Sequence, residues 1–269
     1  MNYPFLVLDF SVGSGEGEHV TSHLFMIMAV GAGIGFLGGL LGKGGSALAT
    51  PLLVAFGIPP VIALAAPLPA TVPGTLVAAD SYRRKGLIDR NVLVWSLLAG
   101  VPATVVGAIG SKFVDAHALI LVTDAVIAVL GLRMVFGASH GDAAVADGPV
   151  DRRLIIGVAV VTGLAAGLLA NSGGFLLAPL FIAVLGMAIK PALGTSLAVA
   201  AVLAVPGTLV HLALGHLDLV VVVAFAVGSV PLSRFGARVA LRTDPSRLER
   251  GYGAVLALLG AGFLLAAFV

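Results

Sequence analysis

Long runs without a charged residue dominate this chain. Residues 44–79 and 154–189 each hold 36 consecutive uncharged residues, and residues 91–111, 191–217 and 251–269 are also free of charge. The runs are uniformly apolar and lack the alternation of a membrane β-barrel. Backbone groups in lipid must pair internally, so the runs predict helices. The predicted segments lie near 24–41, 46–57, 62–80, 91–112, 117–136, 153–169, 174–186, 191–213, 218–240 and 248–268.

The composition agrees with a polytopic, all-α membrane protein. Of the 269 residues, 59% are hydrophobic and only 10% are charged, against roughly 25% charged in soluble domains. So few charges cannot cover a water-exposed surface, which excludes a nucleic-acid-binding protein, a secreted disulfide scaffold and a conventional soluble enzyme. The sequence has no cysteine, so disulfides and thiolate metal sites are excluded. We expect neither a metal nor a cofactor.

The two halves of the chain match each other. At an offset of 128 residues the matches include Gly35 with Gly163, Pro51 with Pro179 and Leu52 with Leu180. At an offset of 129 they include Gly86 with Gly215, Asp89 with Asp218 and Pro102 with Pro231. Paired prolines and aspartates at one offset indicate a repeat. We predict membrane repeats at 24–136 and 153–269, an extracytoplasmic segment at 1–23 and a polar cytoplasmic linker at 137–152.

Loop charges predict that the two repeats have opposite orientations in the membrane. The loop at 80–90 holds four Lys or Arg residues and its counterpart at 211–218 holds none. The stretch 234–250 holds five arginines, whereas its counterpart near 112–116 holds only Lys112. Cytoplasmic loops carry the Lys/Arg excess, so each repeat crosses an odd number of times. Either five segments cross, or the first two form a re-entrant hairpin and three cross. Both versions place the two termini outside.

Each repeat contains a glycine-rich break, which we name the first break (residues 42–46) and the second break (residues 170–174). Glycine adopts left-handed backbone conformations and ends helices there. The short helix that follows presents free N–H groups and the positive end of its dipole. Two such helix ends near the symmetry axis predict an anion site of the kind that transporters build at the membrane midplane.

The candidate anion-binding residues come from the two breaks and from the long apolar run that follows the second. They are Lys43, Gly44, Gly45, Ser46, Asn171, Ser172, Gly173, Gly174, Thr195 and Ser196. Lys43 is the only charged residue between Glu18 and Asp80. Such a lysine is costly inside a membrane, so it either balances an anionic substrate or extends to cytoplasmic lipid phosphates.

The other candidate residues also have two interpretations each. Asn171 donates to an oxyanion or caps a helix, and the hydroxyls of Thr195 and Ser196 ligate an oxyanion or bond back to a carbonyl one turn earlier. His211 is an interfacial histidine or a proton carrier. Asp124, the only acid well inside a segment, couples protons or pairs with a neighbouring helix.

The motifs of both halves resemble those of the TauE/SafE family of membrane permeases. In the first half they comprise Gly35, Gly39, Gly42, Gly44, Gly45, Pro51, Leu52, Tyr82, Gly86, Ile88 and Asp89. In the second half they comprise Gly173, Gly174, Pro179, Leu180, Gly194, Thr195, Ser196, Leu197, His211, Gly215, Leu217 and Asp218. The resemblance, from about residue 24 to 268, implies an inner-membrane permease for small sulfur-containing anions such as sulfite, thiosulfate, sulfonates or sulfoacetate.

Departures from the family pattern fall where substrate would bind. Ser46 replaces the third glycine of the first motif, residues 170–172 replace most of the second, and residues 65–67 (Ala-Ala-Pro) stand where the family often has Gly-Thr-Ser. The particular anion therefore does not follow from the resemblance.

We predict a secondary anion transporter that works by alternating access, with H⁺ or Na⁺ as the coupling ion. The repeats and their breaks favour this function over two alternatives. One is a passive anion channel. The other is an intramembrane hydrolase with Ser46 as nucleophile and His211 as base.

Overall fold

The computed structural model describes residues 16–42, 46–110, 125, 128–136, 150–168, 174–213 and 215–266. Within these ranges every element is a helix or a loop, so the prediction of an all-α fold is confirmed. The helices are α1 (Glu16–Leu41), α2 (Ser46–Ala55), α3 (Pro60–Ala65), α4 (Pro67–Arg83), α5 (Arg90–Gly110), α7 (Arg152–Leu168), α8 (Gly174–Ala183), α9 (Ile189–Ala213), α10 (Leu219–Arg242) and α11 (Pro245–Ala266). Residues 128–136 are also helical.

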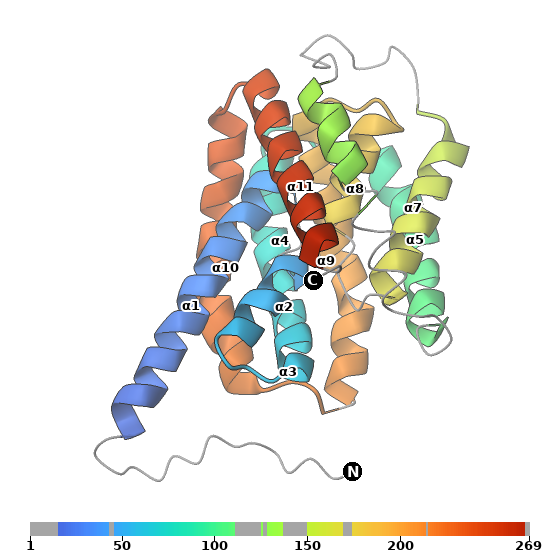
Figure 1. Cartoon of the computed structure of the whole chain (residues 1–269). Coiled ribbons are helices and arrows are strands. Elements are labelled where there is room, and N and C mark those ends of the chain that lie inside the picture. The colour runs from blue at the N-terminus through green and yellow to red at the C-terminus, as the bar shows by residue number, and fades with distance from the viewer. Residues whose placement is uncertain are drawn as a thin grey trace.

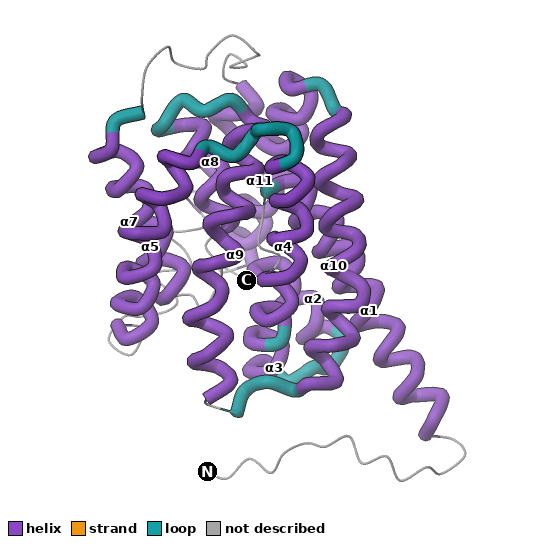
Figure 2. The backbone as a smooth tube through the Cα atoms, turned by 180° about the vertical axis from the view of Figure 1, so that it is seen from behind, coloured by secondary structure: helices purple, strands orange, loops and turns teal. Residues whose placement is uncertain are grey.

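Five of the described helical stretches are long and apolar enough to cross a membrane. They are Thr21–Leu41, Pro60–Arg83, Arg90–Gly110, Ile189–Ala213 and Leu219–Arg242. The stretch Pro60–Arg83 contains both α3 and α4, where the sequence predicted one segment at 62–80. Pro67 lies in the first turn of α4, where proline is tolerated because that N–H has no partner within the helix. The long helices run roughly side by side, and most connecting loops lie at the two ends of the bundle (Figure 2).

Two helical hairpins enter the bundle from opposite ends. Helix α2 folds back along α1, because Ala49 and Leu53 share a buried cluster with Ile27 and Ile34 of α1. Figure 1 shows α2 and α3 returning toward the end of the molecule at which α1 begins. Helix α8 likewise folds back along α7, and its Phe181 packs in one cluster with Ile155 and Val158.

The closest helix pairs join the two halves of the chain. Helix α1 packs along α10, and α5 packs along α7. Both contacts bring backbones together at glycine, since a Cβ added to Gly39 would overlap the carbonyl oxygen of Ser233, and one added to Gly167 would overlap that of Thr104. Small residues permit this approach, which drives helix association in lipid.

The loops after α4 and α9 have the same design. Gly86 and Gly215 adopt positive φ angles of 69° each, which glycine allows without strain. Asp89 then accepts a hydrogen bond from the Val92 N–H at 3.0 Å, and Asp218 accepts one from the Val220 N–H at 2.8 Å. Each aspartate caps the helix that follows, α5 or α10.

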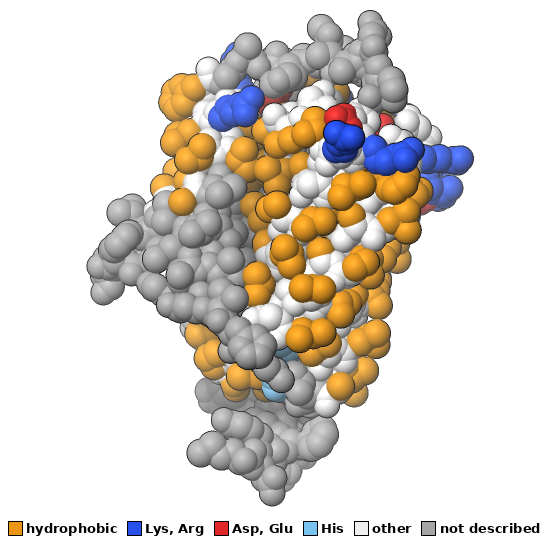
Figure 3. Space-filling view, turned by 90° about the vertical axis from the view of Figure 1, so that its right-hand side faces the viewer, with side chains coloured by type: hydrophobic (Ala, Val, Ile, Leu, Met, Phe, Trp, Pro, Cys, Tyr) orange, Lys and Arg blue, Asp and Glu red, His pale blue; other side chains and the backbone are white. Residues whose placement is uncertain are grey.

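Lysine and arginine gather at one end of the bundle, which we name the basic end. It comprises the end of α4, the starts of α5, α7, α9 and α11, and the end of α10. Lys190 of α9 donates to the Leu241 carbonyl of α10 at 3.2 Å, and the Arg152 guanidinium of α7 lies 4.2 Å from the Trp95 ring centre of α5. Figure 3 shows these cations above a hydrophobic band, with histidine near the other end. This distribution is typical of a protein embedded in a bilayer.

Candidate functional site

The first break begins at Gly42, which follows the last residue of α1 and has a φ angle of 67°. Helix α2 then starts at Ser46, so the predicted end of the preceding helix at the first break is confirmed. Helix α8 starts at Gly174, and residues 170–173 of the second break lie outside the described residues. Several candidate residues lie outside the described residues: Lys43, Gly44, Gly45, Asp124, Asn171, Ser172 and Gly173.

Ser196 connects the second half of the chain to the first break. Its Oγ lies 3.2 Å from the Gly42 carbonyl oxygen and 2.9 Å from that of Leu193, one turn earlier in α9. A Cβ on Gly42 would lie only 2.8 Å from this Oγ and 2.7 Å from Cδ2 of Leu193. Gly42 is therefore required both by its backbone angle and by the close packing of α9.

Thr195 joins the same region to the start of α5. Its Oγ1 accepts a hydrogen bond from the Asp89 N–H at 3.0 Å. Thr195 and Ser196 are both completely buried. The Ser196 proton goes to a backbone carbonyl, as in the back-bonding interpretation, and the Thr195 oxygen holds the loop before α5. In this conformation Ser196 holds the backbone at Gly42, and Thr195 holds the backbone of the loop before α5.

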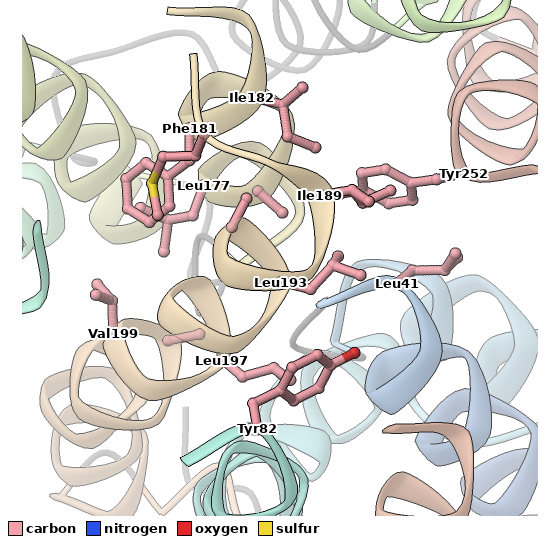
Figure 4. Close-up of a cluster of buried hydrophobic side chains, with 14 of the residues drawn as sticks. Leu41, Tyr82, Leu177, Phe181, Ile182, Ile189, Leu193, Leu197, Val199 and Tyr252 are labelled. Atoms are coloured by element: carbon pink, nitrogen blue, oxygen red, sulfur yellow. The ribbon is translucent and has the colours of Figure 1, made fainter. Parts of the chain in front are cut away.

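Tyr82 fills the space beside these residues. Tyr82 is completely buried. A Cβ added to Gly194 would lie 2.7 Å from the Cβ of Tyr82. Figure 4 shows its ring beside Leu197, with Leu193 and Leu41 nearby. The end of α1, the end of α4 and the first turns of α9 thus meet at the first break. Ser196 follows the start of α9 by seven residues, about 10 Å along a helix, so Gly42 lies inside the bundle.

A cavity of about 860 Å³ opens at the basic end, close to this region. It is lined by parts of three segments, 86–91, 150–153 and 185–191. Asp89 lines it and also donates its N–H to Thr195. The Asp89 backbone therefore connects the wall of this cavity to Thr195, the neighbour of Ser196.

His211 lies far from the first break. It follows Ser196 by 15 residues on α9, about 22 Å along the helix. The hydrolase alternative pairs His211 with Ser46, whose side chain lies outside the described part of the structure. His211 instead faces His216, with the two Nδ1 atoms 3.2 Å apart.

Two features of the structure were not predicted from the sequence. One is His216, five residues after His211 and across the Gly215 turn. The other is a pair of buried hydroxyl residues on each of α4 and α10: Thr71 and Thr75, and Ser229 and Ser233. A spacing of four residues within each pair puts both hydroxyls on one helix face. This spacing is visible in the sequence and could have indicated the two pairs.

These observations define a polytopic helical membrane protein with a buried meeting point of its two halves. The family model for the sulfite exporter TauE/SafE matches residues 27–263. The chain belongs to the TauE/SafE family. Its membership confirms the resemblance seen in the motifs.

Curated relatives cover most of this chain. A "Probable membrane transporter protein" of Xylella fastidiosa (strain 9a5c) is 30% identical over 240 residues, covering 86% of this chain and 92% of the relative. The "Probable membrane transporter protein YjnA" of Bacillus subtilis (strain 168) is 27% identical over 236 residues, covering 83% and 92%. No solved structure gives a significant match. Both the family and these names indicate membrane transport.

Proposed function

We propose that this protein is a secondary transporter of small sulfur-containing anions, of the sulfite, thiosulfate, sulfonate or sulfoacetate class. Membership of the TauE/SafE family supports the substrate class. The observation that carries the mechanism is the contact between Ser196 of the second half and Gly42 at the first break. A site at the junction of two halves opens alternately to each side when one half rocks against the other.

Matched contacts support two repeats with opposite orientations. Gly35 of α1 meets the backbone of Ser229 in α10, and Gly163 of α7 meets the backbone of Gly100 in α5. Gly35 and Gly163 differ by 128 positions, and Gly100 and Ser229 by 129. The two hairpins α1–α2 and α7–α8 start at opposite ends, as inverted repeats with three crossings and one re-entrant hairpin each require.

The anion site is proposed at the two breaks. Helices α2 and α8 start there, and their N-terminal N–H groups and dipoles favour an anion. Residues 43–46 and 171–174 supply these groups, and Lys43 supplies a positive charge. Thr195 and Ser196 hold the surrounding backbone in place. The basic end faces the cytoplasm of an inner membrane, and both termini lie outside.

Counterflow in proteoliposomes tests the transport mechanism. We expect unlabelled sulfite inside the vesicles to accelerate uptake of radiolabelled sulfite several-fold, because a carrier must return its site to the other side before each new uptake. A channel does not show this acceleration. If uptake is equal with and without internal sulfite, and faster than in protein-free vesicles, the protein is a channel and the carrier mechanism is wrong. The absence of flux for all four anion classes contradicts the proposed substrate.

Cysteine labelling tests the orientation, because the natural chain has no cysteine. We expect Lys85→Cys to react with a membrane-impermeant maleimide only from the cytoplasmic side. His216→Cys, in the equivalent loop of the other half, should react only from outside. Labelling of both positions from one side of intact and inverted vesicles would exclude inverted repeats.

A further inference from the structure

Four buried hydroxyl residues line a second, much smaller cavity between α1, α4, α9 and α10. We name it the hydroxyl cavity and define it by Thr71, Thr75, Ser229 and Ser233. Its volume is about 20 Å³. A single water-sized particle needs at least roughly 10–15 Å³ on the same measure. The hydroxyl cavity therefore fits one water molecule or one small ion and excludes a sulfur oxyanion.

Three of the four hydroxyls donate their proton to a backbone carbonyl. Thr71 donates to the Pro67 carbonyl at 2.9 Å, Thr75 to that of Thr71 at 2.7 Å, and Ser233 to that of Ser229 at 2.8 Å. A hydroxyl has one proton and two lone pairs. These three oxygens can therefore only accept, so they suit a cation and cannot donate to an anion.

The fourth hydroxyl needs a ligand. Ser229 is only 4% exposed, and no described residue gives its Oγ a hydrogen-bond partner. A buried polar group without a partner costs about 1–3 kcal/mol. Its position on the wall of the hydroxyl cavity makes the contents of that cavity its natural partner.

In the other half of the chain, a leucine side chain occupies the space that corresponds to the hydroxyl cavity. Gly74 of the hydroxyl cavity matches Leu203 at the repeat offset of 129, and Thr71 and Thr75 match Ala200 and Ala204. The Leu203 side chain packs beside Gly100, the counterpart of Ser229, at 3.4 Å from where a Cβ on Gly100 would lie. Three of the four hydroxyls are therefore absent from the other half, where the fourth, Ser233, matches the buried Thr104. The space and the full set of four hydroxyls thus occur together only at the hydroxyl cavity.

We propose that the hydroxyl cavity binds one Na⁺ ion. Hard cations prefer oxygen ligands, and transporters coordinate Na⁺ with protein oxygens near the bilayer midplane. The cavity is bounded by α1 and α4 of the first half and by α9 and α10 of the second. A bound ion therefore contacts both halves and favours the conformation in which they are closed around it.

The ion couples to the anion, and this step rests on the proposed function. Gly39 lines the hydroxyl cavity and precedes Gly42 by three residues, about 5 Å along a helix. Among the described residues that line the cavity there is no carboxylate. The charge of Na⁺ is therefore balanced best by an anion bound at the neighbouring break. Each ligand then raises the affinity for the other by the same factor.

Thermal unfolding of the purified protein in detergent tests the site without relying on transport. We expect Tm to rise with Na⁺ but not with K⁺ or choline at equal ionic strength, because a ligand stabilises the state that it binds. Sulfite should lower the Na⁺ concentration that gives half of the Tm rise. Ser229→Ala and Thr75→Val should each raise that concentration about ten-fold or more, as expected for a lost contact to a charged group.

Thr104→Val is the matched control for Thr75→Val. Thr104 is equally buried and donates to the carbonyl four residues earlier at 2.8 Å, but it does not line the hydroxyl cavity. We expect its Na⁺ dependence to match the natural protein. Both valine variants keep the shape of threonine, and size-exclusion chromatography verifies that each is folded.

The outcomes separate this site from the proposed function. Equal effects of Na⁺ and K⁺ on Tm, with sulfite counterflow intact, mean that the cavity holds only water and overturn the Na⁺ site alone. A Ser229-dependent Na⁺ effect without flux of any sulfur anion keeps the Na⁺ site and overturns the proposed substrate. An Na⁺ effect that Ser229→Ala and Thr75→Val leave unchanged places the ion elsewhere and also rejects this site.

Discussion

Replacing Gly39 or Gly167 by alanine is expected to lower the stability of the folded protein strongly. A Cβ at either position overlaps a carbonyl oxygen of the partner helix, Ser233 in α10 or Thr104 in α5. Backbone atoms cannot turn aside as a flexible side chain can, so the two helices must separate. Overpacking of a core costs about 1–3 kcal/mol, occasionally more, and a contact with backbone belongs at the upper end. Fluorescence-detected size-exclusion chromatography after heating measures the loss.

The same two helices supply the controls. An added Cβ on Gly33 of α1 or on Gly157 of α7 meets nothing within 4 Å. Alanine is a better helix former than glycine by about 1 kcal/mol, so both variants should be as stable as the natural protein or slightly more so. If Gly39→Ala and Gly33→Ala melt at the same temperature, α1 and α10 do not pack as described.

Lys43→Gln is expected to remove most transport while leaving the protein folded. Lys43 is the only positive charge proposed at the anion site, and glutamine keeps a similar length without the charge. Loss of one partner from a buried charge pair costs about 2 kcal/mol or more, which is roughly 30-fold in affinity. Sulfite counterflow at sub-saturating concentration should fall by about this factor.

Lys85→Gln removes the same charge from an exposed position at the basic end. We expect its counterflow to remain within about two-fold of the natural protein, because exposed charges are screened by salt. Unchanged flux in Lys43→Gln for every sulfur anion tested means that the site does not depend on this charge. The break would then bind the anion through backbone N–H groups alone.

Much of the helix order could be predicted from the sequence. Charges are expensive in lipid, so most of each described helix lies within an uncharged run. The end of α1 was predicted because Gly42 takes a backbone angle that ends a helix. The division of the run 62–80 into α3 and α4 was missed, because a proline in the first turn of a helix resembles one inside a continuous segment.

Helix partners could not be predicted, because they depend on which face of a helix each small residue occupies. The chain has 36 glycines. Gly33 and Gly39 lie on one helix, yet only Gly39 touches another backbone. Similarly, the sequence left Ser196 with two interpretations. Only the tertiary structure places the Gly42 carbonyl, 154 residues away in sequence, beside its hydroxyl.

The pairing of α1 with α10 also determines the order of assembly during synthesis. About 180 residues separate the end of α1 from the start of α10, whereas only about 40 separate α5 from α7. At about 5–20 residues per second the ribosome needs roughly 10–35 s to reach α10. We therefore expect α5 and α7 to associate first, while the glycines of α1 that contact α10 still lack this partner. Of the two pairs, the one whose first helix is made earlier is therefore the later to form.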